Sequence, residues 1–374
     1  MKALVVAGAR PNFMKVAPIL EQLQCAGAER VFVHTGQHYD VSMSEAFFRD
    51  LELPAPDFYL GVGSGSHAKQ TARVMEAFEP VLVESKPDWV VLVGDVNSTL
   101  ACALVAAKLR QSLGCRVAHV EAGLRSNDWN MPEEVNRVLT DRVSDLLLTP
   151  SHDAVPNLLR EGIAPERMVF VGNVMIDSLM KQLPAARALN MAARVGVEGK
   201  PFVLATLHRP SNVDDRRQLG EILEGLAAIS REATVVLPLH PRTRDRIKEF
   251  GFESLSESLS ILEPLGYREM LGLLDAAAVT ITDSGGVQEE STVLGVPCAT
   301  LRETTERPVT ITEGTNRLAE WPLTSERIVS AYRAAMADGR KQVGERVPDG
   351  WDGRAAERVV RALMSQPAYD PAAS

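Results

Sequence analysis

Short apolar segments alternate with longer amphipathic segments along almost the whole chain. The apolar segments have the length of β-strands, and the segments between them repeat apolar residues with the period of a helix. Continuous apolar strands that alternate with helices are typical of parallel sheets covered by helices on both faces. The pattern therefore predicts an α/β protein with doubly wound sheets. The predicted strands are 3–7, 31–34, 89–93, 116–120, 146–149, 168–171, 202–206, 234–239, 259–262, 279–282 and 298–301.

A break in this alternation divides the sequence into two halves of similar length. A predicted strand ends near Gly172, and the helical segment after it leads into a polar, glycine-containing stretch at 194–200. The length of 374 residues fits two domains, because one domain usually has about 100–200 residues. We predict domains at 1–174 and 175–352, with a C-terminal helix in 353–374 that packs back on the N-terminal domain.

Composition and charge narrow the classes of partner. The chain has 40 lysines and arginines against 49 aspartates and glutamates, a net charge of −9. This balance argues against nucleic-acid binding but allows a small phosphorylated ligand. No apolar run approaches the roughly 18 residues of a membrane span, and the first residues hold too short an apolar run for a signal peptide. We therefore expect a cytoplasmic protein that does not bind membranes.

The cysteines and histidines do not indicate a metal site. Four isolated cysteines, without a Cys-x-x-Cys pair, predict buried thiols in a reducing compartment and no structural zinc. His208 and His240 follow two successive predicted strands, at 202–206 and 234–239. A site with two histidines would need a third ligand nearby, and the sequence offers no local one.

Charged residues follow several predicted strands in the first half. In doubly wound sheets the ligand lies beyond the carboxyl ends of the strands, so these residues are candidates for chemistry. Arg10 and Lys15 flank a helix start, where free N–H groups attract anions. Asp95 and Glu121 follow buried strands, and Glu133 opens a helix. Each also has an ordinary explanation, either a surface ion pair or a place at a helix start.

The strongest local signal in the second half is Ser284-Gly285-Gly286, which follows a predicted strand and opens a helix. Adjacent glycines let the backbone approach a pyrophosphate and direct N–H groups towards it, although a plain serine-capped helix would also fit. Glu290, about one turn further on, could accept hydrogen bonds from ribose hydroxyls. The segment lacks the spacing of dinucleotide-binding and P-loop motifs, so neither NAD nor ATP is indicated as a cofactor.

A set of motifs occurs in the order found in one enzyme family. They are Arg10-Pro11 with Lys15, Gly94-Asp95, His119-Val120-Glu121-Ala122-Gly123-Leu124-Arg125, Pro132-Glu133-Glu134 with Asn136-Arg137, His208-Arg209, Asp283-Ser284-Gly285-Gly286 with Gln288-Glu289-Glu290, and Thr305-Glu306-Arg307-Pro308. Over essentially its whole length the chain resembles the non-hydrolysing UDP-N-acetylglucosamine 2-epimerases. The resemblance implies two Rossmann-like domains in the glycosyltransferase-B arrangement, an active site in the cleft between them, and a homodimer that uses no cofactor.

The resemblance also implies a reaction and a set of residues for it. Family members reversibly invert C2 of a UDP-activated N-acetylhexosamine, by anti elimination of UDP to a 2-acetamidoglucal and re-addition of UDP to the opposite face. Three carboxylates match the catalytic ones, and the resemblance leaves open which acts as acid or base in each direction. The matching catalytic residues are Asp95, Glu121, Glu133 and His208; the matching substrate-binding residues are Arg10, Lys15, His208, Leu265, Ser284, Gly285, Gly286, Glu290 and Arg307.

One segment departs from many bacterial members. Where those have Gln-His-Arg-x-Met-Leu in an allosteric site for the substrate, this chain has Gln37-His38-Tyr39-Asp40-Val41-Ser42-Met43. The loss of a cation and the presence of Asp40 predict little or no activation by UDP-N-acetylglucosamine. The segment is also similar to that of members acting on UDP-diacetamido-uronic acids, so the sugar stays open. Further alternatives are a hydrolysing epimerase, a glycosyltransferase of the same architecture and a non-catalytic nucleotide-sugar sensor.

Overall fold

The computed structural model describes residues 1–36, 47–367 and 369, and the segment behind the prediction about activation, 37–43, lies outside them. The chain forms two compact units: unit 1 comprises Met1–Lys181 and Asp349–Ser374, and unit 2 comprises Gln182–Pro348. The chain leaves unit 1 inside helix α7 (Val174–Ala188) and returns to it after Pro348. The units therefore divide the chain at somewhat different residues from the domain ranges predicted from the sequence.

Unit 1 is built on a seven-stranded sheet in which all neighbouring strands are parallel, in the order β3-β2-β1-β4-β5-β6-β7. Strand β4 is buried along its whole length, as expected for a strand covered on both faces. The strand order reverses beside β1, and a ligand site forms at the carboxyl ends of the strands at such a reversal. The strands are β1 (Lys2–Ala7), β2 (Glu29–His34), β3 (Phe58–Tyr59), β4 (Trp89–Val93), β5 (Arg116–Val120), β6 (Leu146–Thr149) and β7 (Met168–Phe170).

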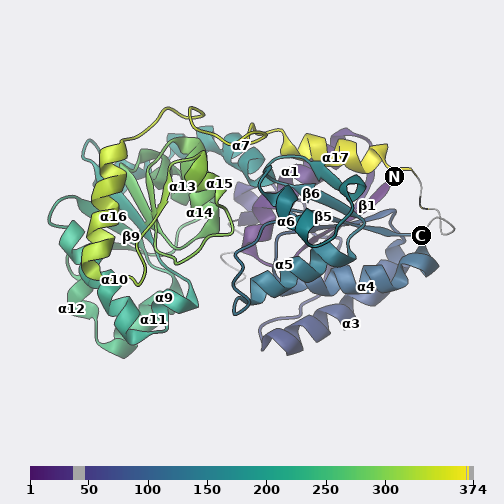
Figure 1. Cartoon of the computed structure of the whole chain (residues 1–374), viewed down its shortest axis with the longest axis horizontal. Helices are drawn as coiled ribbons and strands as arrows, with labels where there is room; N and C mark the ends of the chain where they lie inside the picture. Colours follow the sequence, from purple (N-terminus) through teal and green to yellow (C-terminus); the bar gives the residue numbers. More distant parts are fainter. Residues whose placement is uncertain (37–46, 368, 370–374) are drawn as a thin grey trace. The chain divides into compact units, whose positions relative to one another are not determined.

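The C-terminal helix α17 (Ala355–Ser365) belongs to unit 1 and packs beside α1 (Arg10–Cys25), as Figure 1 shows. Its first turn is held by Asp177, which accepts hydrogen bonds from Ala355 N and Ala356 N at 3.0 and 2.7 Å. A carboxylate at this place satisfies N–H groups that have no partner inside the helix. The other helices of unit 1 are α3 (His67–Ser85), α4 (Asn97–Leu113), α5 (Pro132–Val143), α6 (Ala154–Arg160) and the 3-10 helix η1 (Pro165–Arg167).

Unit 2 repeats the same plan with a six-stranded parallel sheet, ordered β10-β9-β8-β11-β12-β13. Its strand order reverses beside β8. The strands are β8 (Phe202–Thr206), β9 (Thr234–Pro238), β10 (Ser260–Leu262), β11 (Val279–Thr282), β12 (Cys298–Thr300) and β13 (Asn316–Leu318). The helices are α8 (Met191–Arg194), α9 (Pro210–Val213), α10 (Arg216–Ile229), α11 (Pro241–Phe250), α12 (Glu253–Ser256), α13 (Tyr267–Ala276), α14 (Gly285–Leu294), α15 (Val309–Thr312) and α16 (Ser325–Asp338).

These two sheets confirm the predicted fold class, and every strand predicted from an apolar run is present. Strands β3 and β13 were not predicted. Both lie at an edge of their sheet and are short, so neither produces a continuous apolar run in the sequence. None of the described helices is both long and apolar enough to span a membrane.

Candidate active site

Glu121 is the first residue after β5 and forms a buried ion pair with Lys15 of α1. Lys15 Nζ donates to Glu121 Oε2, and both residues are 5% exposed. The other carboxylate oxygen, Oε1, is buried and has no hydrogen-bond partner among the described residues. The ammonium group balances the charge of a carboxylate that burial would otherwise destabilise. Within the described residues, the carboxylate is therefore paired through one of its two oxygens.

Gly94 brings the loop after β4 against this ion pair. Its backbone φ is 66°, in the left-handed region where glycine carries little strain. A Cβ atom at this position would lie 3.2 Å from Lys15 Nζ and 3.5 Å from Glu121 Oε2. The absent side chain therefore lets the loop that carries Asp95 approach Glu121.

Asn12 joins the loop after β1 to the same region. Its Oδ1 accepts hydrogen bonds from Gly8 N and Ala9 N, each at 3.0 Å, and its Nδ2 donates to Val93 O at 3.2 Å. The hydrogen bonds of Asn12 thus join the ends of β1 and β4 at the reversal in strand order. Arg10 is the first residue of α1, and its side chain lies outside the described part of the structure.

Asp95 is held by Arg137 of α5. The guanidinium group of Arg137 donates to Asp95 Oδ2 and to Glu134 Oε2, and Arg137 itself is 2% exposed. The side chain of Asp95 keeps 28% exposure, so its carboxylate is both charge-paired and accessible. Arg137 appears in the sequence only as one residue of a motif. Its role as the partner of Asp95 becomes visible once α5 lies beside the end of β4.

The structure separates the neighbouring carboxylates Glu133 and Glu134. Glu134 is 1% exposed and accepts hydrogen bonds from Ser126 N, Ser126 Oγ and Asn127 N, with the last at 2.8 Å. It therefore anchors the loop before α5 and has no capacity left for chemistry. Glu133 is partly buried in the first turn of α5 and has no hydrogen bond or ion pair within the described residues. The accessible carboxylate of the two is therefore Glu133.

In unit 2, His208 is held in place by Asp283 at the end of β11. His208 Nδ1 lies 2.9 Å from Asp283 Oδ1, and the same carboxylate accepts hydrogen bonds from His208 N and Arg209 N at 3.0 and 2.9 Å. Burial opposes the ionisation of Asp283, but the charge of His208 and these hydrogen bonds lower its pKa to about 2. The His208 side chain is 45% exposed, so the rest of the ring can meet a ligand.

A cluster of arginines surrounds the start of α14. Arg307 contacts Glu306 and, through Nε, Glu289 at 2.7 Å, while Arg302 Nη2 lies 2.7 Å and Arg209 Nη2 lies 3.5 Å from Glu306. Three guanidinium groups therefore gather around these two carboxylates. Arg302 Nη1 is buried with no hydrogen-bond partner in the described part of the chain. Such an arrangement attracts an anion, and the N-terminus of α14 adds to this attraction.

The glycine segment is shaped to fit this cluster. A Cβ atom at Gly285 would lie 2.5 Å from Arg307 Nη1, so only glycine lets the guanidinium group pack against this turn. The Ser284 side chain makes no capping hydrogen bond to α14 among the described contacts. The structure therefore does not support the plain serine-capped helix as the explanation for this segment.

Glu290 lies further along α14 and is 5% exposed. Tyr267, the first residue of α13, donates its hydroxyl hydrogen bond to Glu290 Oε1 at 3.0 Å. Burial raises the pKa of Glu290 to about 7, with a further contribution from the charge of Glu289 and a partial opposing effect of Tyr267. Leu265 is partly buried in the loop that precedes α13. Tyr267 was not predicted, because nothing in its own sequence neighbourhood indicates a carboxylate partner.

The structure thus gathers the predicted residues into one set in each unit. In unit 1, Asp95 and Glu121 follow β4 and β5, and Lys15 and Glu133 lie in α1 and α5. In unit 2, His208 follows β8, Ser284 and Gly285 are at the start of α14, Glu290 lies in the middle of α14, and Arg307 precedes α15. Within residues 1–36, 47–367 and 369, no group of three or more histidine, cysteine, aspartate or glutamate side chains is placed to hold a metal ion. His240 accepts a hydrogen bond from Arg242 N at 3.3 Å and caps α11.

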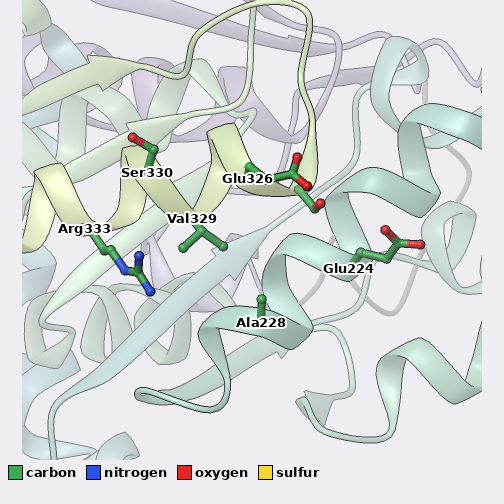
Figure 2. A pocket seen from close by; sticks show the side chains of 7 residues that line it. Glu224, Ala228, Glu326, Val329, Ser330 and Arg333 are labelled. Atoms are coloured by element: carbon green, nitrogen blue, oxygen red, sulfur yellow. The ribbon is translucent and has the colours of Figure 1, made fainter.

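A separate surface pocket of about 420 Å³ lies between α10 and α16 of unit 2, with side chains from both helices facing it in Figure 2. Among the described residues, those that line this pocket include none of the predicted site residues. The lining contains acidic, basic and small side chains. It is formed by Glu224, Ala228, Ser325, Glu326, Val329, Ser330 and Arg333. Arg333 pairs with Glu232 at 2.5 Å, so its charge is already balanced within the unit.

Comparison with known proteins identifies relatives over nearly the whole chain. The chain is 42% identical over 371 residues to the UDP-N-acetylglucosamine 2-epimerase of Methanocaldococcus jannaschii, covering 97% of this chain and 99% of that protein. It is 40% identical to the UDP-2,3-diacetamido-2,3-dideoxy-D-glucuronate 2-epimerase of Pseudomonas aeruginosa, covering 97% and 99% of the two chains. The Methanocaldococcus jannaschii UDP-GlcNAc 2-epimerase in complex with UDP-GlcNAc and UDP matches the structure with a TM-score of 0.88, over 98% and 100% of the chains at 41% identity.

A more distant likeness concerns the fold alone. WaaG, a glycosyltransferase involved in lipopolysaccharide biosynthesis, matches at 13% identity with a TM-score of 0.56, covering 100% of this chain and 98% of that one. Together with the epimerase structure it confirms the predicted fold of glycosyltransferase-B type. The sequence profile described as UDP-N-acetylglucosamine 2-epimerase matches residues 21–364, which is most of the chain. This chain therefore belongs to the UDP-N-acetylglucosamine 2-epimerase family.

Proposed function

We propose that this enzyme reversibly converts UDP-N-acetylglucosamine to UDP-N-acetylmannosamine by inverting C2 of the sugar. The observation that carries the proposal is the buried ion pair between Lys15 and Glu121, which lies against the loop that carries Asp95. Glu121 Oε1 has no hydrogen-bond partner among the described residues. Carboxylates concentrated at adjacent strand ends suit the removal and return of a proton at one carbon. A glycosyltransferase would use the nucleotide site but would not need the three carboxylates of Asp95, Glu121 and Glu133.

The proposed chemistry begins with loss of UDP. The C1–O bond to UDP and the C2–H bond break, a C1–C2 double bond forms, and one enzyme carboxylate takes the proton. UDP then adds back to C1 while an acid delivers a proton to the opposite face of C2. Inversion therefore needs a proton acceptor and a proton donor on opposite faces, which Asp95, Glu121 and Glu133 are proposed to supply. The order in which they act stays open.

The departing UDP carries negative charge that the enzyme must stabilise, and electrostatic stabilisation of this kind is often the largest contribution to catalysis. We assign this role to Arg10, Lys15 and His208, with Arg307 and the start of α14 at the nucleotide. His208 suits the role because Asp283 fixes its ring while 45% of the side chain stays exposed. Ser284, Gly285, Gly286 and Glu290 are assigned to the diphosphate and ribose, and Leu265 to the uracil.

A specific alternative exists for the sugar of the proposed substrate. The Pseudomonas aeruginosa relative is named for a UDP-diacetamido-glucuronate, and its identity to this chain is close to that of the Methanocaldococcus jannaschii enzyme. The deciding experiment incubates the enzyme in deuterated water with each UDP-sugar and follows C2 by NMR. Deuterium at C2 and the manno isomer with UDP-N-acetylglucosamine support the proposal. If the enzyme converts only the UDP-diacetamido-uronic acid, that sugar becomes the proposed substrate and the proposed inversion at C2 stands.

The same samples test the remaining alternatives. Free sugar accumulating in step with UDP would identify a hydrolysing epimerase, and the absence of deuterium incorporation from every UDP-sugar would favour a non-catalytic sensor. Transfer of the sugar to an added acceptor would identify a glycosyltransferase. A homodimer and a place in the cytoplasm stay predictions from the sequence.

A further inference from the structure

His119 connects the loops of Asp95 and Glu121 from inside unit 1. It lies in β5, two residues before Glu121, and its side chain has no solvent exposure. Ring atom Nε2 lies 2.8 Å from the carbonyl oxygen of Gly94, the residue before Asp95. Because a backbone carbonyl oxygen can only accept a hydrogen bond, Nε2 is the donor. The ring therefore ties the loop after β4 to strand β5.

Asp141 of α5 holds the other side of the same ring. Its Oδ1 lies 2.6 Å from His119 Nδ1, and its Oδ2 accepts hydrogen bonds from Gly123 N at 3.0 Å and Arg125 Nη2 at 2.7 Å. Burial opposes ionisation, but the charges of His119 and Arg125 hold the pKa of Asp141 below its ordinary value. Asp141 therefore holds the Nδ1 side of the ring, while Nε2 donates to Gly94 O.

Three residues in the loops after β4 and β5 have a left-handed backbone. Gly94, Glu121 and Gly123 have φ values of 66°, 70° and 83°. A glutamate with a left-handed backbone is strained, and such strain persists only where the surroundings enforce it. His119 binds the carbonyl of Gly94 and Asp141 binds the N–H of Gly123. The pair thus fixes the backbone of both loops.

We propose that His119 and Asp141 form a buried positioning pair that keeps Asp95, Glu121 and Glu133 in their reactive arrangement. The pair reaches Asp95 through Gly94 and Glu121 through Gly123. It reaches Glu133 through α5, the helix that carries both Glu133 and Asp141. Both side chains are fully buried, so neither touches the substrate and both act only through their neighbours. The inference rests on the proposed function, because it concerns the same three carboxylates.

Two replacements of His119 separate its two hydrogen bonds. In His119→Gln the amide nitrogen lies near the place of Nε2 and can still donate to Gly94, whereas in His119→Asn it lies near the place of Nδ1 and can reach only Asp141. We expect His119→Asn to lower kcat by about 100-fold, because small displacements of reacting groups have effects of this size. His119→Gln should retain roughly ten times more activity than His119→Asn. KM and the affinity for UDP should change by less than about threefold in both.

Asp141→Asn tests the second half of the pair, and His152→Gln is the matched control. Asp141→Asn removes the charge at nearly constant shape, so we expect a loss of kcat comparable to that of His119→Asn. His152 also lies in unit 1, but its side chain is 65% exposed and pairs with Asp349 at the surface. His152→Gln should match the parent enzyme. Circular dichroism and thermal unfolding of each variant show what fraction is folded, and kcat is compared per folded molecule.

A measurement on the unmodified enzyme covers the case in which a variant does not fold. Nitrogen-15 NMR of labelled histidines should show one ring whose Nε2 carries a proton that is protected from exchange with solvent. A His119 ring without a proton on Nε2 would overturn the proposal, as would a His119→Asn variant that is as active as His119→Gln. If the proposed function is wrong, the parent enzyme will show no exchange at C2. If only the role of His119 and Asp141 is wrong, the parent enzyme will still show this exchange.

Discussion

Tyr267 and Glu290 form a hydrogen bond of 3.0 Å in the interior of unit 2, although they lie 23 positions apart in the sequence. Both residues are 5% exposed, so this contact joins the start of α13 to the middle of α14 without much competition from water. Burial raises the pKa of Glu290 to about 7, and the Tyr267 hydroxyl lowers it in part by stabilising the carboxylate. The proposed ribose ligand is therefore close to its midpoint of titration at neutral pH.

This pKa makes UDP binding depend on pH. The ionised Glu290 accepts hydrogen bonds from both ribose hydroxyls, whereas the protonated form has lost part of that capacity. Affinity for UDP should therefore rise between pH 6 and pH 8, by up to roughly tenfold for a single group of this pKa. Calorimetry across this range measures it, with Glu290→Gln as the control, because titration of UDP itself is common to both proteins. Tyr267→Phe should move the midpoint of this change in UDP affinity to higher pH. If UDP affinity depends on pH in the same way in the parent enzyme and in Glu290→Gln, the assignment of Glu290 is wrong.

Replacing the accessible carboxylates should affect turnover more than folding. Asp95→Asn and Glu133→Gln should each lower kcat by a factor on the order of 100 or more, the expected loss for a missing general acid or base. UDP should still bind, because neither Asp95 nor Glu133 is among the proposed UDP ligands. Rates from NMR and UDP affinity from calorimetry test this, and near-normal turnover in both variants would remove the assignment.

Glu134→Gln is the matched variant for this comparison and should affect stability first. Its carboxylate accepts hydrogen bonds from Ser126 and Asn127 and pairs with the buried Arg137. Loss of the charge leaves these donors poorly satisfied, at a cost of about 1–3 kcal/mol in the free energy of unfolding. Urea unfolding measures this cost. A catalytic loss with unchanged stability would instead place Glu134, and not Glu133, in the reaction.

Gly285→Ala should displace Arg307. The new Cβ would lie 2.5 Å from Arg307 Nη1, so the guanidinium group must move away from the turn that precedes α14. We expect at least about tenfold weaker UDP binding, since loss of a charged hydrogen bond typically exceeds 1.4 kcal/mol. Gly65→Ala is the control, because its Cβ would meet neighbouring atoms no closer than 3.9 Å. Equal UDP affinity in the two variants would show that Arg307 does not bind the nucleotide.

Asp283 predicts a specific loss of stability in acid. Its folded pKa is about 2, below the ordinary value of 3.8, so it stabilises the fold above pH 4 and this contribution disappears as the pH falls through 2. The full effect amounts to about 2 kcal/mol. Asp283→Asn cannot titrate, so its stability should decline less steeply between pH 4 and pH 2.5 in urea unfolding. Identical slopes would show that the His208–Asp283 contact does not lower this pKa.

The sequence predicted elements with continuous apolar runs and missed those without them. Strand β4 is recognisable because covering helices require an apolar residue at every position. Strand β13 pairs with a neighbour on one side only and contains Asn316 and Arg317, so its hydrophobicity is too weak to indicate a strand. Domain limits were harder still, because the passage between the units lies inside α7, where the chain stays helical from Val174 to Ala188.

By itself, the sequence determined the fold class, the family and the residue types at the strand ends, because these depend on local periodicity and on short motifs. Only the tertiary structure decided which partner each residue meets. Glu133 and Glu134 are adjacent and chemically alike, yet one is sequestered by Ser126 and Arg137 and the other stays accessible. His119 and Asp141 likewise meet only after β5 and α5 pack. A side chain's charge balance and accessibility depend on neighbours that folding brings from distant positions, and periodicity contains no information about them.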